Sequence, residues 1–280
     1  MLVYLNGEFL PLEQARISPL DRGFLFGDGV YEMVPFYHGI PFLFEEHITR
    51  LGRSLQALDI KNPLTKDQWK AIVHTLSEQA SLPTHNIYLQ ITRGAGLSRQ
   101  HQYEDGLEPT VFAMVTNMRL LSDAEKQTGL RAVTVPDERW QNCYIKSLNL
   151  LPNILAIQQA YVQQAYEAIQ IHQGYVTEGA SSNVFIVKQN ILFTPPKTAE
   201  ILWGITRDFV LSLARKHHIA FEERALNEDE LYDADEIWIT SSGREVVPIT
   251  RLNDHRVGDG EVGPIWKKIN ASYENARNAC

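Results

Sequence analysis

The 280-residue sequence contains only two cysteines, Cys143 and the terminal Cys280. Two cysteines cannot build a disulfide framework, and these two lack the spacing of metal ligands, so we expect no metal site and a reduced, cytoplasmic compartment. No run of about 18 consecutive apolar residues occurs, which excludes a membrane-spanning helix. Residues 1–5 are apolar, but Asn6-Gly7-Glu8 follows at once, so the start lacks the pattern of a signal peptide.

Basic charge is also scarce in this chain. The 26 Lys and Arg residues are outnumbered by 34 Asp and Glu residues, which gives a net charge of −8, and the basic residues form no block. Nucleic acid and anionic membranes are therefore not expected as partners. Hydrophobic residues make up 44% and charged residues 21% of the chain, an ordinary globular composition. The length allows one large domain or two modest ones.

The pattern of apolar residues predicts strands and helices in both halves of the chain. In the first half we expect a hairpin that turns at Asn6-Gly7, a second pair (30–37 and 40–44) that turns at His38-Gly39, two helices (48–58 and 69–76) and two strands (86–92 and 110–116). A capping box formed by Thr65 and Gln68 precedes the second helix.

The polar segment 117–129 lacks strand character and is the expected domain boundary, with a smaller domain at 1–120 and a larger one at 121–280. In the second half we expect a strand at 130–135, a helix near 148–165, two strand pairs between 167 and 193, a helix that opens at Gly204-Ile205-Thr206, a strand at 236–240 and a last helix near 262–276. These elements predict an α+β (mixed α/β) fold rather than a regular βαβ array.

Two isolated charges are the most informative feature. Lys146 is the only Lys, Arg, Asp or Glu between Trp140 and Tyr166, and Glu178 is the only one between Ala168 and Val187. Burial lowers the pKa of a lysine and yields a nucleophilic amine, as a Schiff base with a carbonyl requires. Two simpler interpretations remain open here: each residue is solvated, or the two form a salt bridge.

The residues around Glu178 and elsewhere favour a flat, phosphate-bearing ligand. Small residues follow Glu178 at 179–183, so a ring could lie there while the carboxylate keeps a pyridine nitrogen protonated. Three groups of donors are candidates for a phosphate: the helix start at Gly204-Ile205-Thr206, the strand end at 240–243, and Arg50. Each is weak alone, since helix starts are commonly caps and an arginine on a helix is commonly solvated.

Several motifs together resemble the fold-type IV pyridoxal-phosphate enzymes, and most of all their D-amino acid aminotransferases. The first motif is the string DRGFLFGDGVYE at 21–32. Others follow in register: Glu46-His47-Ile48 with Arg50-Leu51, Arg139-Trp140, 145–151, 177–185 and 204–208. The order and spacing hold over nearly the whole chain.

The resemblance implies a two-domain fold, with pyridoxal 5′-phosphate at the domain interface and the Schiff-base lysine in the larger domain. Lys146 is implied to form the aldimine and to shuttle the proton, and Glu178, with Arg139 beside it, to hold the pyridine nitrogen. The other cofactor contacts implied are Arg50, Ser182, Leu202, Ile205, Thr206, Ser241 and Ser242.

The prediction that the protein belongs with the D-amino acid aminotransferases rests on the loop 93–101. Arg99 and His101 can both point into one cavity from an extended loop, and a substrate carboxylate prefers charge-assisted partners. Together with Tyr31, this pair resembles the site that binds the substrate carboxylate in D-amino acid aminotransferases. In this family the loop usually reaches the neighbouring subunit's site, so a homodimer is implied. The simpler alternative is that both side chains are solvated.

The implied reaction is transamination of D-amino acids, in which D-alanine and 2-oxoglutarate give pyruvate and D-glutamate through a Lys146 aldimine and a 1,3-proton shift. An aminodeoxychorismate lyase or a branched-chain L-amino acid transaminase on the same fold is the alternative, and a non-catalytic protein that kept the fold is the alternative from another class. A dinucleotide enzyme finds little support, because no helix opens after Gly23, Gly27 and Gly29.

Overall fold

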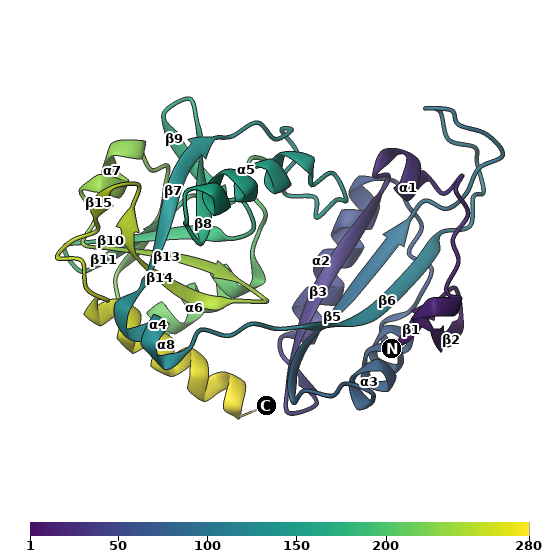
Figure 1. Cartoon of the computed structure of the whole chain (residues 1–280), viewed down its shortest axis with the longest axis horizontal. Helices are drawn as coiled ribbons and strands as arrows, with labels where there is room; N and C mark the ends of the chain where they lie inside the picture. The colour runs from purple at the N-terminus through teal and green to yellow at the C-terminus, as the bar shows by residue number, and fades with distance from the viewer. Residues whose placement is uncertain (280) are drawn as a thin grey trace. The chain divides into compact units, whose positions relative to one another are not determined.

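A computed structural model describes residues 1–279, so Cys280 lies outside the described residues. These residues form two compact units. Unit 1 comprises 1–118 and 145–149, and unit 2 comprises 119–144 and 150–279. Figure 1 labels the elements of both. Within residues 1–279, no helix has both the length and the apolar character that a bilayer span requires.

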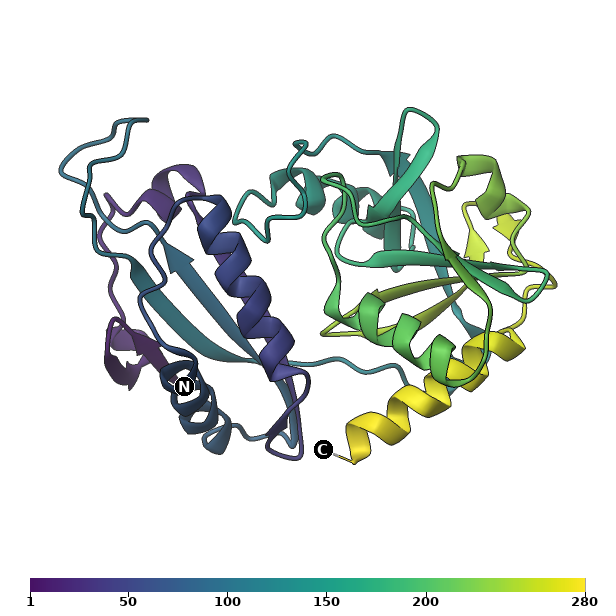
Figure 2. The same ribbon diagram turned by 180° about the vertical axis from the view of Figure 1, so that it is seen from behind.

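Unit 1 is built on an antiparallel sheet. Its strands lie in the order β2 (Glu8–Pro11), β1 (Leu2–Leu5), β6 (Thr110–Asn117), β5 (Thr84–Thr92), β3 (Gly29–Tyr37) and β4 (Ile40–Pro41). Its helices are η1 (Leu12–Gln14), α1 (Arg22–Phe26), α2 (Phe44–Ala57) and α3 (Lys66–Glu78). Helix α2 packs against β3, and α3 packs against β1, β5 and β6 (Figure 2). The apolar faces predicted for the two helices supply this contact.

Local sequence signals decide the ends of several of these elements. The first hairpin is confirmed, because Asn6 and Gly7 adopt the positive φ angles of 47° and 102° that such a turn requires. The Thr65/Gln68 capping box of α3 is also confirmed. The second hairpin is shorter than predicted: β4 ends at Pro41, which cannot donate to a ladder, and α2 starts at Phe44.

Unit 2 is built on a mixed sheet. The order of its strands is β12 (Phe221–Glu223), β11 (Ile191–Thr194), β10 (Asn183–Lys188), β13 (Glu236–Ser241), β14 (Glu245–Leu252), β7 (Leu130–Pro136), β8 (Glu167–His172) and β9 (Tyr175–Gly179), with β15 (His255–Arg256) paired to β14. Its helices are α4 (Asp123–Thr128), α5 (Leu151–Val162), α6 (Ile205–Lys216), α7 (Glu228–Tyr232) and α8 (Pro264–Asn278). An isolated bridge between Gly179, the last residue of β9, and Ser182, just before β10, closes the turn that joins these two strands.

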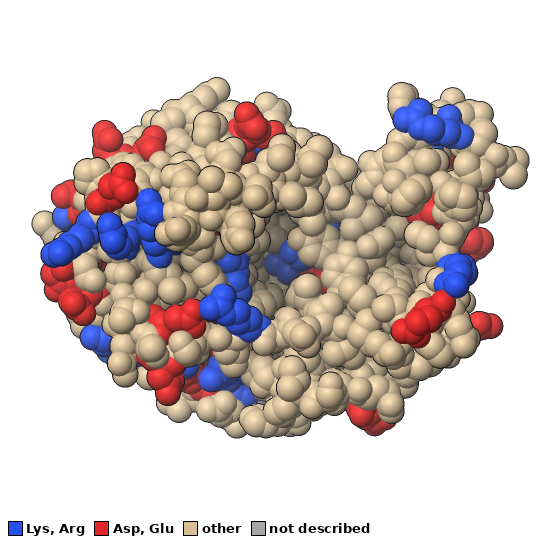
Figure 3. Space-filling model, viewed as in Figure 1, with Lys and Arg blue, Asp and Glu red and all other residues tan. Residues whose placement is uncertain are grey.

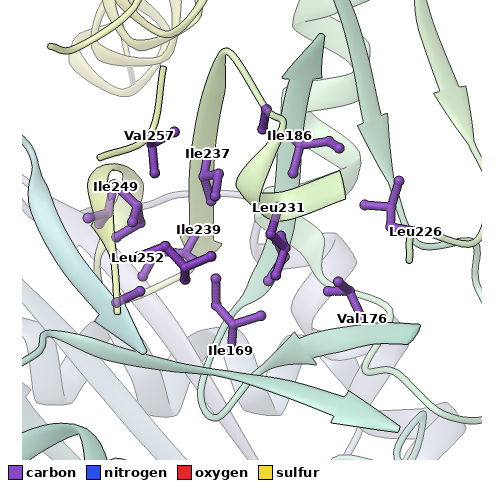
Figure 4. Packing of buried hydrophobic residues seen from close by; sticks show 14 of the residues in the cluster. Ile169, Val176, Ile186, Leu226, Leu231, Ile237, Ile239, Ile249, Leu252 and Val257 are labelled. Carbon is purple, nitrogen blue, oxygen red and sulfur yellow. The ribbon is translucent and has the colours of Figure 1, made fainter. Parts of the chain in front are cut away.

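Branched aliphatic side chains from the unit 2 strands form its main core. Ile169, Ile237, Ile239 and Ile249 are buried together with Leu231 of α7 (Figure 4). Burial of each such side chain contributes roughly 1.5–3 kcal/mol. This core fixes the strands whose ends carry Glu178 and Ser241. At the surface, Figure 3 shows acidic and basic side chains mixed on one face.

The segment 145–149 differs from the sequence-based domain prediction. The sequence predicts a boundary near residue 120 and places Lys146 in the second domain, whereas 145–149 packs in unit 1. The physical reason is the free edge at the start of β3. Val30 pairs with Ser147, and the Leu148 N–H donates to the Gly29 carbonyl at 3.0 Å. Because Leu148 is engaged there, α5 begins only at Leu151, with Pro152 in its first turn.

Candidate active site

Lys146 is held by its backbone against unit 1. The Tyr31 N–H donates to the Lys146 carbonyl at 3.0 Å, and the Lys146 N–H donates to the Ser54 hydroxyl at 3.1 Å. The side chain is half-buried, and its Nζ lies 4.1 Å from the centroid of the Tyr31 ring. In the described part of unit 1, no acidic side chain forms an ion pair with Lys146. The amine therefore faces an aromatic ring and not a carboxylate.

A buried ionic cluster lies near this lysine in unit 1. Glu32 is fully buried and accepts two hydrogen bonds from Arg50, at 2.6 and 2.9 Å, and contacts the His47 ring nitrogen at 2.8 Å. Burial raises the pKa of Glu32, but the Arg50 charge and these hydrogen bonds outweigh burial and hold the pKa well below its usual range. Burial, together with the charges of Arg50 and Lys146, lowers the pKa of His47 despite Glu32. Glu32 is thus anionic, and its charge is compensated by Arg50.

Unit 2 also contains a buried glutamate, Glu178, which is paired with an arginine. Glu178 is the second-last residue of β9 and forms an ion pair with Arg139. The Leu202 N–H donates to both of its oxygens at 3.0 Å, and the Asn183 amide donates to Oε2 at 3.0 Å. Arg139 is shared with Asp137, which it contacts at 2.9 and 2.7 Å.

Burial raises the pKa of Glu178 to about 7, against the lowering effect of Arg139 and the Leu202 N–H, and the charge of Asp137 adds to the rise. The carboxyl group is therefore able to exchange a proton near neutral pH. Such a group suits a partner that carries a proton of its own, such as a ring nitrogen.

A second network in unit 2 joins two turns rich in hydroxyl groups. The fully buried Glu167 accepts from Arg244 at 2.6 Å, from Ser182 at 2.8 Å and from Ser181 at 3.2 Å. Arg244 also lies 3.4 Å from the Ser241 hydroxyl and contacts Ser181 directly. The network thereby links the turn after β9 to the turn after β13.

Donors for an anion gather at the start of α6 and at the end of β13. The N-cap of α6 is Gly204, which offers no side-chain cap, and Ile205 and Thr206 in the first turn are buried. The Thr240 hydroxyl is buried without a hydrogen-bond partner among the described residues. Ser241 and Ser242 follow it directly and are half-buried. Unpaired donors at a helix start suit a phosphate.

The three residues expected to bind a substrate carboxylate fall into two groups in unit 1. Tyr31 lies beside Lys146. Arg99 and His101 are exposed on the loop between β5 and β6, where both contact the Phe26 ring, at 5.1 and 5.6 Å. No ring contact or ion pair in the described residues joins the two groups.

Other chemistry finds little support. No cluster of three or more His, Cys, Asp or Glu suited to a metal ion occurs within residues 1–279. Cys143 is buried, and burial raises the pKa of its thiol to about 12, so the thiol is a poor nucleophile at neutral pH.

Sequence patterns assign no role to some residues of these networks. They are Glu32, His47, Asp137, Glu167, Asn183 and Arg244. Two signals could have identified part of this set: Glu32, His47 and Asn183 lie inside the family motifs, and Asp137 lies two residues before Arg139.

Comparison with known proteins identifies the family of this chain. The family model for amino-transferase class IV matches residues 29–252. The D-alanine aminotransferase of Bacillus licheniformis is 41% identical over 276 residues, which are 99% of this chain and 97% of that protein.

Solved structures match over similar lengths. The branched-chain amino acid aminotransferase of Escherichia coli superposes with a TM-score of 0.92 at 27% identity, covering 98% of this chain and 93% of that one. A hypothetical aminotransferase from Mycobacterium tuberculosis, in a PLP-bound form, gives a TM-score of 0.83 at 25% identity, covering 97% and 98%. The predicted α+β fold and the family resemblance are both confirmed, and the chain belongs to the class IV aminotransferase family.

Proposed function

We propose that this protein transaminates D-amino acids with pyridoxal 5′-phosphate, converting D-alanine and 2-oxoglutarate to pyruvate and D-glutamate. The observation that carries the proposal is the buried Glu178, whose oxygens accept from Arg139, the Leu202 N–H and the Asn183 amide and so form a held carboxylate that can pair with a protonated pyridine nitrogen. The similarity to the Bacillus licheniformis D-alanine aminotransferase supports the choice of D-amino acids. The matched Escherichia coli branched-chain enzyme is less similar, at 27% identity.

The residues present fit the chemical groups of this cofactor. An aldehyde requires a primary amine, which Lys146 provides. A protonated ring nitrogen requires a carboxylate partner, which Glu178 provides. A phosphate requires N–H and hydroxyl donors, and the start of α6 and the unpaired Thr240 hydroxyl provide them in unit 2. The PLP-bound Mycobacterium tuberculosis structure carries such a group on a similar fold.

Each residue then has a defined task. The bound cofactor supplies a ring that accepts the electron pair left on the substrate Cα when its proton is removed. Lys146 takes that proton and returns it, and Tyr31 lies against the same amine. Glu178 keeps the ring nitrogen protonated, while Arg139 balances the charges of Glu178 and Asp137. Leu202 packs on the ring, and its N–H orients Glu178.

The phosphate contacts in this proposal are Arg50, Ser182, Ile205, Thr206, Ser241 and Ser242. For Arg50, the two hydrogen bonds to Glu32 fix the direction of the guanidinium. For Ser182 and Ser241, the Glu167–Arg244 network fixes the turns that carry them. Arg99 and His101 bind the substrate carboxylate, and Arg99 forms no ion pair among the described residues that would compete.

A homodimer completes the proposal, in the cytoplasm as the low cysteine content favours. Helix α5 exposes large apolar side chains along its length, with exposed fractions of 49–73%: Leu151, Ile154, Leu155, Tyr161 and Val162. Exposed apolar surface of this kind commonly marks a protein contact. Light scattering at micromolar concentration should give about twice the 31.9 kDa chain mass. A monomer mass would remove this part of the proposal.

A panel of amino donors and oxo acids tests the reaction. Purified protein loaded with pyridoxal phosphate is given D- or L-alanine with 2-oxoglutarate, and pyruvate is measured. We expect pyruvate from D-alanine and an accompanying yield of D-glutamate. Pyruvate only from L-alanine would assign the chain to L-transamination, and pyruvate from aminodeoxychorismate without an oxo acid would assign it to the lyase reaction.

A further inference from the structure

The loop between β5 and β6 presents a physical problem. It spans residues 93–109 without regular structure, and loops longer than about 12–15 residues are uncommon unless they are functional. Arg99, Gln100 and His101 are exposed. Two side chains can select a carboxylate only if their backbone is held in place, so something must fix this exposed stretch.

Arg22 holds the backbone at this stretch. It is buried, with 7% of its surface exposed, at the start of α1. Its Nη1 donates to the Gln100 carbonyl at 2.7 Å, and its Nη2 donates to the His101 carbonyl at 2.9 Å. The Arg22 N–H also donates to the Gly94 carbonyl at 2.9 Å. One residue thus contacts the loop at its base and at its functional tip.

The guanidinium of Arg22 is itself fixed by Asp28. The Arg22 Nε donates to Asp28 at 2.8 Å, and Arg93 donates to the same carboxylate at 2.9 and 3.1 Å. Burial raises the pKa of Asp28, but the hydrogen bonds from Arg93 and Arg22 outweigh it and hold the pKa below its usual value. Arg93 is anchored in turn on the carbonyls of Leu58 and Asp59. The charges are therefore compensated and the direction of Arg22 is set.

The Phe26 ring supports the side chains of the same stretch. It lies 5.1 Å from the Arg99 guanidinium, 5.6 Å from the His101 ring and 4.9 Å from the Arg22 guanidinium. Arginine over an aromatic face is an attractive contact. Asp21 orients α1, because it caps the Gly23 N–H and accepts from Thr92 at 2.9 Å. The motif at 21–28 therefore builds a surface for the loop.

We propose that Arg22 is the positioning residue for the substrate carboxylate, acting through the Gln100 and His101 carbonyls, with Phe26 as its support. The inference rests on the proposed function, because it assigns the substrate carboxylate to Arg99 and His101. Lysine replaces Arg22 only in part, since an ammonium group lacks the planar fork that serves Asp28 and two carbonyls together.

Two probes that share a reactive aminooxy group separate carboxylate recognition from reaction at the cofactor. Aminooxyacetate carries a carboxylate, and methoxyamine does not. Each forms an oxime with the aldehyde carbon of the bound cofactor, the Lys146 amine leaves, and the visible absorbance changes. The ratio of the two second-order rate constants measures carboxylate recognition without any turnover.

We expect Arg22→Gln to lower the rate constant for aminooxyacetate by about 10- to 100-fold, as misplaced binding groups commonly do. The rate constant for methoxyamine should stay within about twofold, because that probe needs no carboxylate partner. In turnover, the same variant should raise KM for D-alanine more than it lowers kcat. Arg22→Lys should fall between the wild type and Arg22→Gln.

Arg131→Gln is the matched control. Arg131 also donates to two backbone carbonyls, those of Asn253 and Gln163, but in unit 2. It should lower thermal stability without changing the ratio of the probes. If Arg22→Gln fails to fold, Arg22→Lys decides, because it keeps the positive charge beside Asp28 but loses the fork that donates to the Gln100 and His101 carbonyls.

The outcomes separate the two proposals. A wild-type protein that does not favour aminooxyacetate over methoxyamine contradicts the proposed role of Arg99 and His101 itself. A wild type that does favour it, with the same ratio in Arg22→Gln, or in Arg22→Lys where the first variant does not fold, overturns the role of Arg22 alone. An equal loss for both probes also overturns it, since that pattern indicates general damage.

Discussion

Each unit contains a buried glutamate paired with an arginine, and the pKa values of the two glutamates shift in opposite directions. In unit 1, the pKa of Glu32 falls well below its usual range. In unit 2, the pKa of Glu178 rises to about 7. Burial raises the pKa in both cases and is the largest single influence on each.

The difference comes from what each arginine must balance. Arg50 gives Glu32 a two-point contact, and His47 adds a third hydrogen bond. Arg139 divides its donors between Glu178 and Asp137, and the negative charge of Asp137 opposes ionisation of Glu178. The same residue pair thus provides a fixed anion in one unit and a carboxyl group that can exchange a proton in the other. We therefore expect Glu32 to stabilise the fold and Glu178 to serve the proposed chemistry.

Removal of the Lys146 amine should have the largest effect on the rate of the reaction. Lys146→Ala should lower the rate of D-alanine transamination by at least about 10³-fold, because it removes both the covalent partner of the cofactor and the general base. Steady-state rates with D-alanine and 2-oxoglutarate measure this. A loss of less than tenfold would show that another group performs the proton transfer.

Removal of the Glu32 charge should mainly lower the stability of the protein. Glu32→Gln leaves Arg50 buried without its counter-charge, so the unfolding free energy of the cofactor-free protein should fall by about 3–5 kcal/mol at pH 7. Urea denaturation measures this. If Glu178→Gln is the more destabilising of the two at pH 7, the division of roles between the glutamates is wrong.

The raised pKa of Glu178 should make the free energy of unfolding depend on pH. The pKa of Glu178 rises from 4.5 to about 7 on folding, so the folded state binds more protons between these values. Relative to Glu178→Gln, the wild type should lose on the order of 3 kcal/mol as the pH rises from about 4.5 to 7, and then level off. Denaturation of both cofactor-free proteins across this range gives the difference. A difference independent of pH would contradict the raised pKa.

A substitution outside the networks of both glutamates should have the smallest effect, and it shows how a small loss of stability alone affects activity. Thr65→Ala removes the side-chain cap of α3 and should cost about 1 kcal/mol of unfolding free energy. It should leave the D-alanine rate unchanged. A fall in the D-alanine rate in this variant would show that any loss of stability lowers activity, and would weaken the comparison.

The sequence predicts the local features of the fold well where one signal dominates. Asn6-Gly7 and the Thr65/Gln68 box depend on neighbouring residues only, and both form as predicted. Strand β14 was not predicted, since Pro248 interrupts its pattern and its place depends on pairing with β13 and β7. The position of 145–149 also depends on a distant strand edge, and no local pattern encodes it.

For the candidate site, isolated charge identifies residues but not their partners. Lys146 and Glu178 stand out because few charged residues surround them in the sequence. The partners of Glu178 come from residues 137–139, 183 and 202, which only the folded unit brings together. Arg22 was evident as part of a motif, but its contact with the Gln100 and His101 carbonyls is visible only in the structure.

The most direct test of the account is the identity of the residue that carries the cofactor. The protein loaded with pyridoxal phosphate should be yellow, and borohydride should bleach the colour and fix the label covalently. Proteolysis and mass spectrometry should then place the label on Lys146. A label on a different lysine, or a protein that neither colours nor retains a label, would contradict the account.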